Sequence, residues 1–313
     1  MQNLSQTRVV DAILTTHAQG YQRPGNVGPL LFPRVSVGAY GGNVIQFSKE
    51  SFRLLNIVRA PGSRTTRVEF GYAGVPYAIT PKSLEGVVPF ERMRDASQVP
   101  NIDLARVAVD STMDIVELGY ENDCATLART AANYDAGHKA TLAGAALWSA
   151  GTGNPTSDVE AGVEAIRASI GMRPNTVILS ATAFKNARTN PNIIDRYKYT
   201  GRDSITTQML AALWNVQTVA VGEAVSASGQ ADALGDVWGN DVVIAYVAPG
   251  GAGVTRDAAR PSYGYTYTID GMPLVEQPYQ DRNVKSWIYP VTADRQPVLS
   301  GITAGYLIQN AGS

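Results

Sequence analysis

The chain has one pair of side chains whose types suit covalent catalysis, a thiol at Cys124 and an imidazole at His138. A nucleophile and its base must meet within hydrogen-bonding distance. Both residues fall in or next to one long helical pattern, and a helix continuing to Gly137 would hold them about 20 Å apart along its axis. We therefore predict that Cys124 is a small core residue. His138 is expected to be a helix-terminal residue that suits the helix dipole.

Other motifs that carry chemistry are absent or incomplete. Two carboxylate pairs have helical i,i+4 spacing: Asp110 with Asp114, and Glu117 with Glu121. This spacing predicts a solvated or interfacial helix face rather than an acid–base pair. The glycine-rich run 250–253 lacks the lysine of a phosphate-binding loop and is predicted to be a flexible loop tip. With one cysteine, two histidines, and neither an H-E-x-x-H nor a G-x-S-x-G motif, the sequence predicts no metal ion, no cofactor and no enzymatic activity.

The element that would position these residues is a long helix, predicted from Asn101 to about Ala136. Its small or apolar residues recur about every 3.6 positions, the period of one helix face, at Ile102, Ala105, Val109, Met113, Val116, Tyr120, Cys124, Leu127 and Ala131. A heptad repeat does not fit this pattern, so a coiled coil is not expected. Asp103 is the expected N-cap, and Gly137 is the expected stop. Such a helix would be on the order of 50 Å long and would form the backbone of an extended, assembling subunit.

Charge is nearly balanced over the 313 residues, with 26 basic and 27 acidic side chains. It is uneven along the chain, because residues 1–100 hold 11 Lys and Arg against 6 Asp and Glu. A near-neutral chain is not suited to binding nucleic acid through a large phosphate footprint.

Neither a secretory signal nor a membrane-spanning run is expected, and the single cysteine fits a reducing compartment. Arginine supplies 20 of the basic residues, a bias that fits either subunit contacts or a GC-rich genome.

The basic N-terminal part is predicted to contain a long β-hairpin. Two strand-like runs, Phe52–Arg59 and Thr65–Tyr72, flank a turn signal at Pro61-Gly62. Strand alternation places apolar side chains on both faces of this hairpin, and a two-stranded hairpin is marginal alone, so it needs a surface to lie on. Its arginines are candidates for contacts between subunits: Arg53, Arg59, Arg64 and Arg67.

The remaining elements follow from periodicity and turn signals. Before the hairpin we expect a helix within 4–19 and strands at 30–37 and 44–47, and after it a strand at 75–80. From Ser157, expected to cap a helix that ends at Gly171, helices and strands alternate as in an α/β unit with a small buried sheet. Its expected elements are strand 176–179, helices 181–189 and 205–213, and strands 216–221 and 241–247. The tail adds a half-exposed strand at 262–270 and strands at 280–289 and 304–309.

A series of short motifs runs through most of the chain. They are Phe32-Pro33 with Val35 and Val37, Phe52-Arg53, Arg59-Ala60-Pro61-Gly62, Val88-Pro89, Asp103-Leu104, Arg173-Pro174-Asn175-Thr176, Asn190-Pro191, Arg196-Tyr197-Lys198-Tyr199, 210–216, Val221-Gly222-Glu223-Ala224, Asp236-Val237-Trp238-Gly239, 261–266 and 304–308. Each motif is weak alone, and their order makes the match specific. In this order the chain resembles the major capsid proteins of tailed bacteriophages, those with the Hong Kong 97-type fold.

The resemblance implies an α+β, Hong Kong 97-like viral capsid fold with four parts. These are an N-terminal arm at 1–46, an extended β-hairpin loop at 47–92, a peripheral domain with a long spine helix at 93–157 and 276–313, and an axial α/β domain at 158–275. It implies a structural protein that assembles with itself into the hexamers and pentamers of an icosahedral shell. That shell would enclose a double-stranded DNA genome, contacted non-specifically on its inner face.

The resemblance also implies partners and a location. The expected partners are a separate scaffold protein, a portal protein and a decoration protein, with no membrane. The expected location is the virion capsid, assembled in the cytoplasm of the bacterial host. The sequence departs from some relatives, because it has no charged helical pre-segment. It also has no matched pair for a Lys–Asn cross-link, although Lys49 and Lys82 flank the hairpin and Asn283 lies in the tail.

Two other readings stay open at this point. An encapsulin-type nanocompartment uses the same fold to enclose cargo enzymes, and gene neighbours would separate it from a capsid. An α/β enzyme built on the segment after residue 158 would require a cluster of polar groups at the edge of its sheet.

Overall fold

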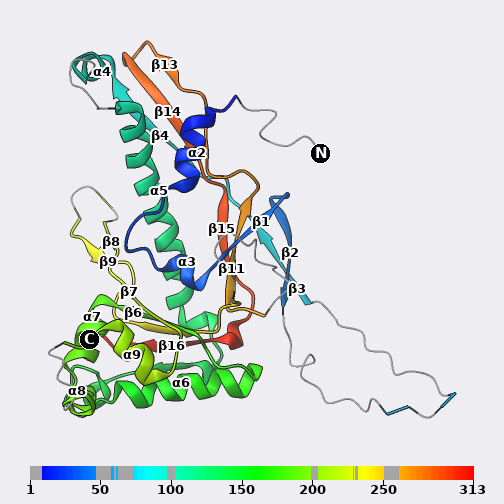
Figure 1. The fold of residues 1–313 in the computed structure, drawn as a ribbon, viewed down its shortest axis with the longest axis vertical. Coiled ribbons are helices and arrows are strands. Elements are labelled where there is room, and N and C mark those ends of the chain that lie inside the picture. Colours follow the sequence, from blue (N-terminus) through cyan, green and yellow to red (C-terminus); the bar gives the residue numbers. More distant parts are fainter. Residues whose placement is uncertain are drawn as a thin grey trace.

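A long helix, α5, runs through an elongated molecule and joins a sheet-rich end to a helix-rich end (Figure 1). The computed structural model describes residues 9–46, 58–59, 61–62, 73–96, 103–198, 204–227, 229, 232–249 and 261–313. Within these residues, no helix is both long enough and apolar enough to cross a membrane.

The helices and strands follow one another along the described part of the chain, and most of them are labelled in Figure 1. The N-terminal half holds α2 (Ala12–Gly20), α3 (Gly28–Leu31), β1 (Arg34–Val37), β2 (Gly41–Gln46), β3 (Ala73–Ala78), β4 (Ser83–Pro89), α4 (Phe90–Ala96), α5 (Leu104–Arg129) and β5 (Lys139–Thr141). The middle holds α6 (Pro155–Ile170), β6 (Thr176–Ser180), α7 (Ala181–Thr189), α8 (Pro191–Tyr197), α9 (Thr207–Trp214), β7 (Thr218–Gly222), β8 (Val225–Ser226), β9 (Gly235–Asp236) and β10 (Val242–Ala245). The C-terminal part holds β11 (Gly264–Ile269), β12 (Leu274–Val275), β13 (Tyr279–Asp281), β14 (Ser286–Thr292), β15 (Arg295–Leu299) and β16 (Gly305–Gln309).

Helix α5 begins as the sequence predicts and ends earlier. The Asp103 side chain caps it by accepting hydrogen bonds from the next two helical amides. The helix stops at Arg129 instead of near Ala136, because Thr130 is extended and side chains beyond it bind the last carbonyls. Asn133 donates to the Leu127 carbonyl and Tyr134 to the Ala128 carbonyl. With 26 residues, α5 is about 39 Å long, shorter than expected.

The predicted apolar face of α5 is confirmed where the structure describes it. Val109, Met113, Tyr120 and Cys124 are buried there. They pack into two hydrophobic clusters, one at each end of the helix. Helix α5 therefore contributes side chains to both hydrophobic cores.

A five-stranded sheet forms the helix-rich end of the molecule, in the order β5-β16-β10-β6-β7. β10 is antiparallel to β6 and β16, whereas β7 runs parallel to β6. The helices α6, α7 and α9 pack against the sheet. The α/β alternation predicted for this part is confirmed in β6, α7, α9, β7 and β10. Two of its strands, β5 and β16, come from outside residues 158–275.

Helix α6 starts three residues before the position that the sequence suggested, which had Ser157 as the N-cap. Its N-cap is Asn154, whose side chain accepts a hydrogen bond from the backbone N–H of Ser157, and Pro155 takes the first helical position. Proline is favoured there because that N–H has no partner within the helix. The predicted stop is confirmed, since Gly171 adopts the left-handed conformation with φ 69°.

The sheet-rich end holds two further sheets around α5. β11 lies between β1 and β15, and β14 pairs with β4, β12 and β13. β11 is buried along its whole length, so the half-exposed strand expected at 262–270 was wrong. The two neighbouring strands and the tyrosine stack of Tyr77 on Tyr267 cover it. The single strand expected at 280–289 is instead two strands, joined by a turn at Lys285 with φ 47°.

The N-terminal elements differ in extent from the predictions. The expected helix at 4–19 is α2, capped by Asp11, and residues 1–8 lie outside the described residues. The expected strand at 30–37 is one helical turn, α3, followed by β1. β2 and β3 pair antiparallel over their whole length, so the end of β2 and the start of β3 lie side by side. Most of the predicted hairpin lies outside the described residues. Its turn is present at Pro61-Gly62, where Gly62 has φ 84°.

Candidate assembly surfaces

Glu121 on α5 joins three distant parts of the subunit. Its fully buried carboxylate accepts hydrogen bonds from the backbone N–H groups of Val27 and Gly28, each at 2.9 Å, where α3 begins. It also accepts one from the indole Nε1 of Trp238 at 2.8 Å. Burial raises the pKa of Glu121, and these hydrogen bonds oppose the rise by favouring the ionised form. Glycine is required at position 28, because a Cβ there would lie 2.8 Å from the Glu121 Oε2.

A second buried carboxylate, Glu117, lies one turn earlier on the same helix. It pairs with the guanidinium of Arg295 on β15 at 2.7 Å, and both side chains are 4% exposed. The Arg34 guanidinium on β1 approaches the same oxygen at 3.4 Å. Arg295 also stacks over the Tyr120 ring, 4.1 Å from its centroid. The expectation of a solvated or interfacial face was therefore wrong for Glu117 and Glu121, because partners from other elements cover them.

The other carboxylate pair receives the N-terminal helix α2. The His17 Nε2 lies 2.6 Å from the Asp110 Oδ1, and the Tyr21 hydroxyl donates to Asp114 at 2.5 Å. Burial and the neighbouring Asp114 raise the pKa of Tyr21 to about 12. Asp110 and Asp114 thus serve a contact within the subunit.

Cys124 and His138 occupy separate environments. Cys124 is a free thiol in the core beside α3, and burial raises its pKa well above the ordinary value. His138 is not the helix-terminal residue that was expected, because α5 ends nine residues before it. Its ring is buried between the Gly305 carbonyl, 2.9 Å from Nδ1, and the Ser169 hydroxyl, 2.8 Å from Nε2. Among the residues that the structure describes, no group of three or more acidic, cysteine or histidine side chains is placed to hold a metal ion.

The four candidate arginines fall in the segment between β2 and β3. Arg59 is exposed, and Arg53, Arg64 and Arg67 lie outside the described residues. The base from which this segment leaves is firmly attached. Asp294 accepts hydrogen bonds from the Tyr40 hydroxyl, at 2.7 Å, and from the backbone N–H of Lys82, at 3.0 Å. The ribbon of β2 and β3 is therefore held to the sheet of β1, β11 and β15.

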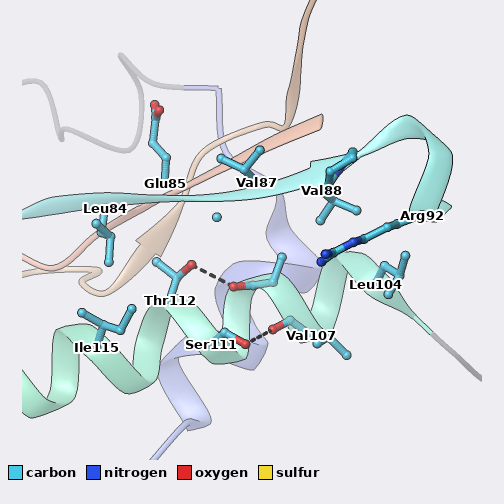
Figure 2. Close-up of a pocket in the computed structure, with 13 residues that line it drawn as sticks. Leu84, Glu85, Val87, Val88, Arg92, Leu104, Val107, Ser111, Thr112 and Ile115 are labelled. Atoms are coloured by element: carbon cyan, nitrogen blue, oxygen red, sulfur yellow. Dashed lines mark hydrogen bonds between the residues drawn. The ribbon is translucent and has the colours of Figure 1, made fainter. Parts of the chain in front are cut away.

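An apolar groove of about 360 Å³ runs between β4 and α5 (Figure 2). Leu84 and Ile115 lie toward one end of it, and Arg92 and Leu104 toward the other. Its lining includes the exposed side chains of Val87 and Val107. The helical periodicity of α5 gave no sign of this second apolar stripe, since Val107 and Ile115 lie off its main apolar face.

The network around Glu121 and Glu117 was missed by reasoning from the sequence. Trp238 was noted only as part of a short motif, and Arg295 was not singled out. Spacing along α5 shows that the two carboxylates share a face, but not that a backbone amide, an indole and a guanidinium come to meet them.

Comparisons with known proteins agree with a structural role. Residues 131–289 match the family described as "Phage major capsid protein E". A "Major capsid protein" of Burkholderia phage BcepMu is 33% identical over 98% of this chain and 98% of its own length. A phage-related protein from Bordetella bronchiseptica RB50, solved by crystallography, is 48% identical with a TM-score of 0.85, and the match covers 97% of this chain and 98% of that one.

More distant structures share the fold alone. The capsid of cyanophage P-SCSP1u has a TM-score of 0.56 at 10% identity, covering 94% of this chain and 90% of its own. The predicted Hong Kong 97-like capsid fold, with helices and sheets of the α+β class, is confirmed. Because a relative above 30% identity spans nearly the whole chain, the chain belongs to the phage major capsid protein family.

Proposed function

We propose that this major capsid protein assembles into hexamers and pentamers of a closed icosahedral shell around double-stranded DNA, without catalytic turnover. The observation that supports this most strongly is its match to a phage major capsid protein over nearly the whole of both chains. The chemistry of the described residues agrees with it, because the buried charges Glu117, Glu121 and Arg295 are all committed to joining elements of the subunit.

The encapsulin-type reading is less well supported. An encapsulin from Synechococcus elongatus PCC 7942 has a TM-score of 0.55 at 13% identity, a likeness that extends to the fold only. The phage relatives, at 33% and 48% identity, favour a capsid.

Further partners and the place of assembly are part of the proposal. A separate scaffold protein, a portal protein and a decoration protein would act with the shell, and assembly would take place in the cytoplasm of the bacterial host. DNA would be contacted non-specifically on the inner face of the shell, through a small phosphate footprint only, because the near-neutral chain is not suited to a large one.

The division into an arm, a hairpin loop, a peripheral domain and an axial domain also stays a proposal. The helix-rich end supports an axial unit over the part of 158–275 that ends with β10, with β5 and β16 contributed from outside that range, whereas β11 and β12 pair with strands of the sheet-rich end. Long helix α5 and β14 support a peripheral unit at the sheet-rich end, and β4, which lies within the proposed hairpin loop at 47–92, pairs with β14 there.

The hairpin at 52–72 is proposed to lie across a neighbouring subunit, with Arg53, Arg59, Arg64 and Arg67 facing carboxylates there. Its alternating apolar residues need a surface on both faces, because a two-stranded hairpin is marginal alone in water. Arg59→Glu should leave the subunit folded and impair assembly, whereas Arg59→Lys, which keeps the charge, should assemble nearly as the unchanged chain does.

Sedimentation of the purified full chain tests both proposals. Particles of megadalton size, or capsomers that convert to them, are expected for the unchanged chain and for Arg59→Lys. A chain that stays monomeric under all assembly conditions would refute the shell. Normal shells from Arg59→Glu would refute the contact at Arg59 alone.

A further inference from the structure

Asp294 holds both of the segments that flank the ribbon of β2 and β3. It lies between β14 and β15 and is 1% exposed. Its Oδ2 accepts a hydrogen bond from the Tyr40 hydroxyl, directly before β2, at 2.7 Å. Its Oδ1 accepts one from the backbone N–H of Lys82, between β3 and β4, at 3.0 Å. One buried carboxylate therefore fastens the chain both before it enters the ribbon and after it leaves.

The surroundings of Asp294 tie the same place to the rest of the subunit. The Ala293 N–H donates to the Lys82 carbonyl at 2.9 Å, and the Ile269 N–H donates to the Asp294 carbonyl at 3.1 Å. The Lys82 ammonium pairs with Asp123 on α5. Asp294 thus lies where the sheet of β4 and β14, the sheet of β1, β11 and β15, and helix α5 come together.

The ribbon takes its direction from side chains at its base. Among the described strands, β2 and β3 pair only with each other, over six residues of each. The Tyr77 ring packs close to Gly42 and stacks on Tyr267, with ring centroids 4.3 Å apart. Aromatic rings pack favourably in more than one arrangement, so this stack alone permits several ribbon angles. Hydrogen bonds to a carboxylate are directional, and the two at Asp294 select one angle.

A small change in this angle would displace the far end of the ribbon by a distance that matters for contacts. The six residues of β2 span about 17 Å from first to last, so a rotation of about 10° at the base moves the last by about 3 Å. A guanidinium displaced that far from a carboxylate no longer makes a hydrogen-bonded ion pair with it.

We propose that Asp294 is a positioning residue for assembly, which fixes the direction in which the ribbon carries the hairpin at 52–72 toward a neighbouring copy. This rests on the proposed shell and on the proposed contact of the hairpin. A segment that is held in its bound direction before contact loses less conformational freedom on binding. Because it is buried in its own subunit, Asp294 acts through the ribbon instead of touching the neighbour.

Distances between two spin labels in the full chain test whether Asp294 fixes the ribbon. The labels are attached at Asn43→Cys on β2 and Glu160→Cys on α6, two exposed positions, while the native Cys124 is buried. In free subunits, Asp294→Asn should broaden the distribution of label distances by at least about 3 Å. Tyr40→Phe, which removes one hydroxyl and keeps the bond to Lys82, should broaden it less. An unchanged distribution in Asp294→Asn would overturn the proposal.

Assembly of the same two variants tests the functional part of the proposal. Tyr40→Phe should raise the subunit concentration needed for shells by about fivefold, the effect of losing about one hydrogen bond, and Asp294→Asn by at least about tenfold. Tyr134→Phe is the matched control, because it removes a buried hydroxyl that donates to the Ala128 carbonyl. Tyr134 belongs to the larger hydrophobic cluster, whereas Tyr40 packs on the cluster at the base of the ribbon.

The control separates a loss of stability from a loss of direction. Tyr134→Phe should lower the unfolding midpoint as Tyr40→Phe does, with unchanged label distances and unchanged assembly. Equal assembly defects in these two variants would overturn the proposal. Broadened label distances in Asp294→Asn together with normal assembly would overturn it too.

Failure of the proposed function gives a different result. Arg59→Glu, beyond the ribbon, should impair assembly without broadening the label distances. An unchanged chain that forms no shells would refute the shell, and with it the role of Asp294 in assembly. A broadened distribution in Asp294→Asn would in that case still show that Asp294 fixes the ribbon.

Discussion

Replacing Glu121 should destabilise the subunit more than any exposed acidic residue does. Its carboxylate satisfies three buried donors, the N–H groups of Val27 and Gly28 and the indole of Trp238. Glu121→Leu leaves all three unpaired, at about 1–3 kcal/mol each, offset in part because no charge is then buried. We expect a net loss of about 3–6 kcal/mol in the free energy of unfolding for Leu.

Glutamine at position 121 removes the negative charge while keeping nearly the same side-chain shape. Glu121→Gln keeps one acceptor oxygen, loses the stronger bonds to a charged acceptor, and turns an NH₂ group toward a donor. A net loss of about 2–3 kcal/mol in the free energy of unfolding follows, or a fall in Tm of about 3–5 °C for a chain of this length. Differential scanning calorimetry of free subunits measures both variants. Glu164→Gln, on the exposed face of α6, removes only a surface ion pair with Arg167 and is the control, with an expected change in Tm of less than about 1 °C.

The dependence on pH gives a second test of the same residue. Burial raises the folded-state pKa of Glu121 above its ordinary 4.5, so the folded state binds this proton more tightly. The resulting stabilisation is fully present below about pH 4.5 and is lost as the pH rises through the folded-state pKa. The difference in the free energy of unfolding between the unchanged chain and Glu121→Gln should therefore increase as the pH falls. A difference in the free energy of unfolding that narrows as the pH falls would contradict the structural role of Glu121. A Glu121→Leu protein as stable as the unchanged chain would contradict it too.

Two further predictions concern buried groups beside it. Arg295→Ala leaves Glu117 buried with only the longer contact to Arg34, so we expect a loss of about 3 kcal/mol, measured by urea unfolding; an unchanged midpoint would contradict a structural role for the pair. Cys124 should not react with a thiol reagent at pH 8 until denaturant is added, because burial hides the thiol and raises its pKa; prompt stoichiometric labelling of native subunits would place it outside the core.

Periodicity and turn signals predicted the elements that depend on local chemistry. The N-cap at Asp103, the stop at Gly171 and the turn at Pro61-Gly62 are set by neighbouring residues, and the structure has all three. The end of α5 was missed because distant side chains decide it: Asn133 and Tyr134 take over the last carbonyls of the helix.

The candidate contacts could be predicted from sequence only where they are local. The arginines of the hairpin follow from a turn and two alternating runs, and their role between subunits stays a prediction. The burial of Glu117 and Glu121 could not be predicted, because helical spacing says only that two carboxylates share a face. Val27, Trp238 and Arg295 reach that face from positions about 90 to 180 residues away. Similarly, the full burial of β11 could not be predicted, because alternation within a strand does not show which other elements will cover it.

Electron microscopy of the purified full chain tests the central claim most directly. Closed shells with five- and six-fold capsomers should form from the chain, alone or with a scaffold protein, and a reconstruction should show α5 and the sheet of β4 and β14 in every subunit. A chain that yields only single subunits or irregular aggregates, with and without a scaffold protein, would contradict the claim.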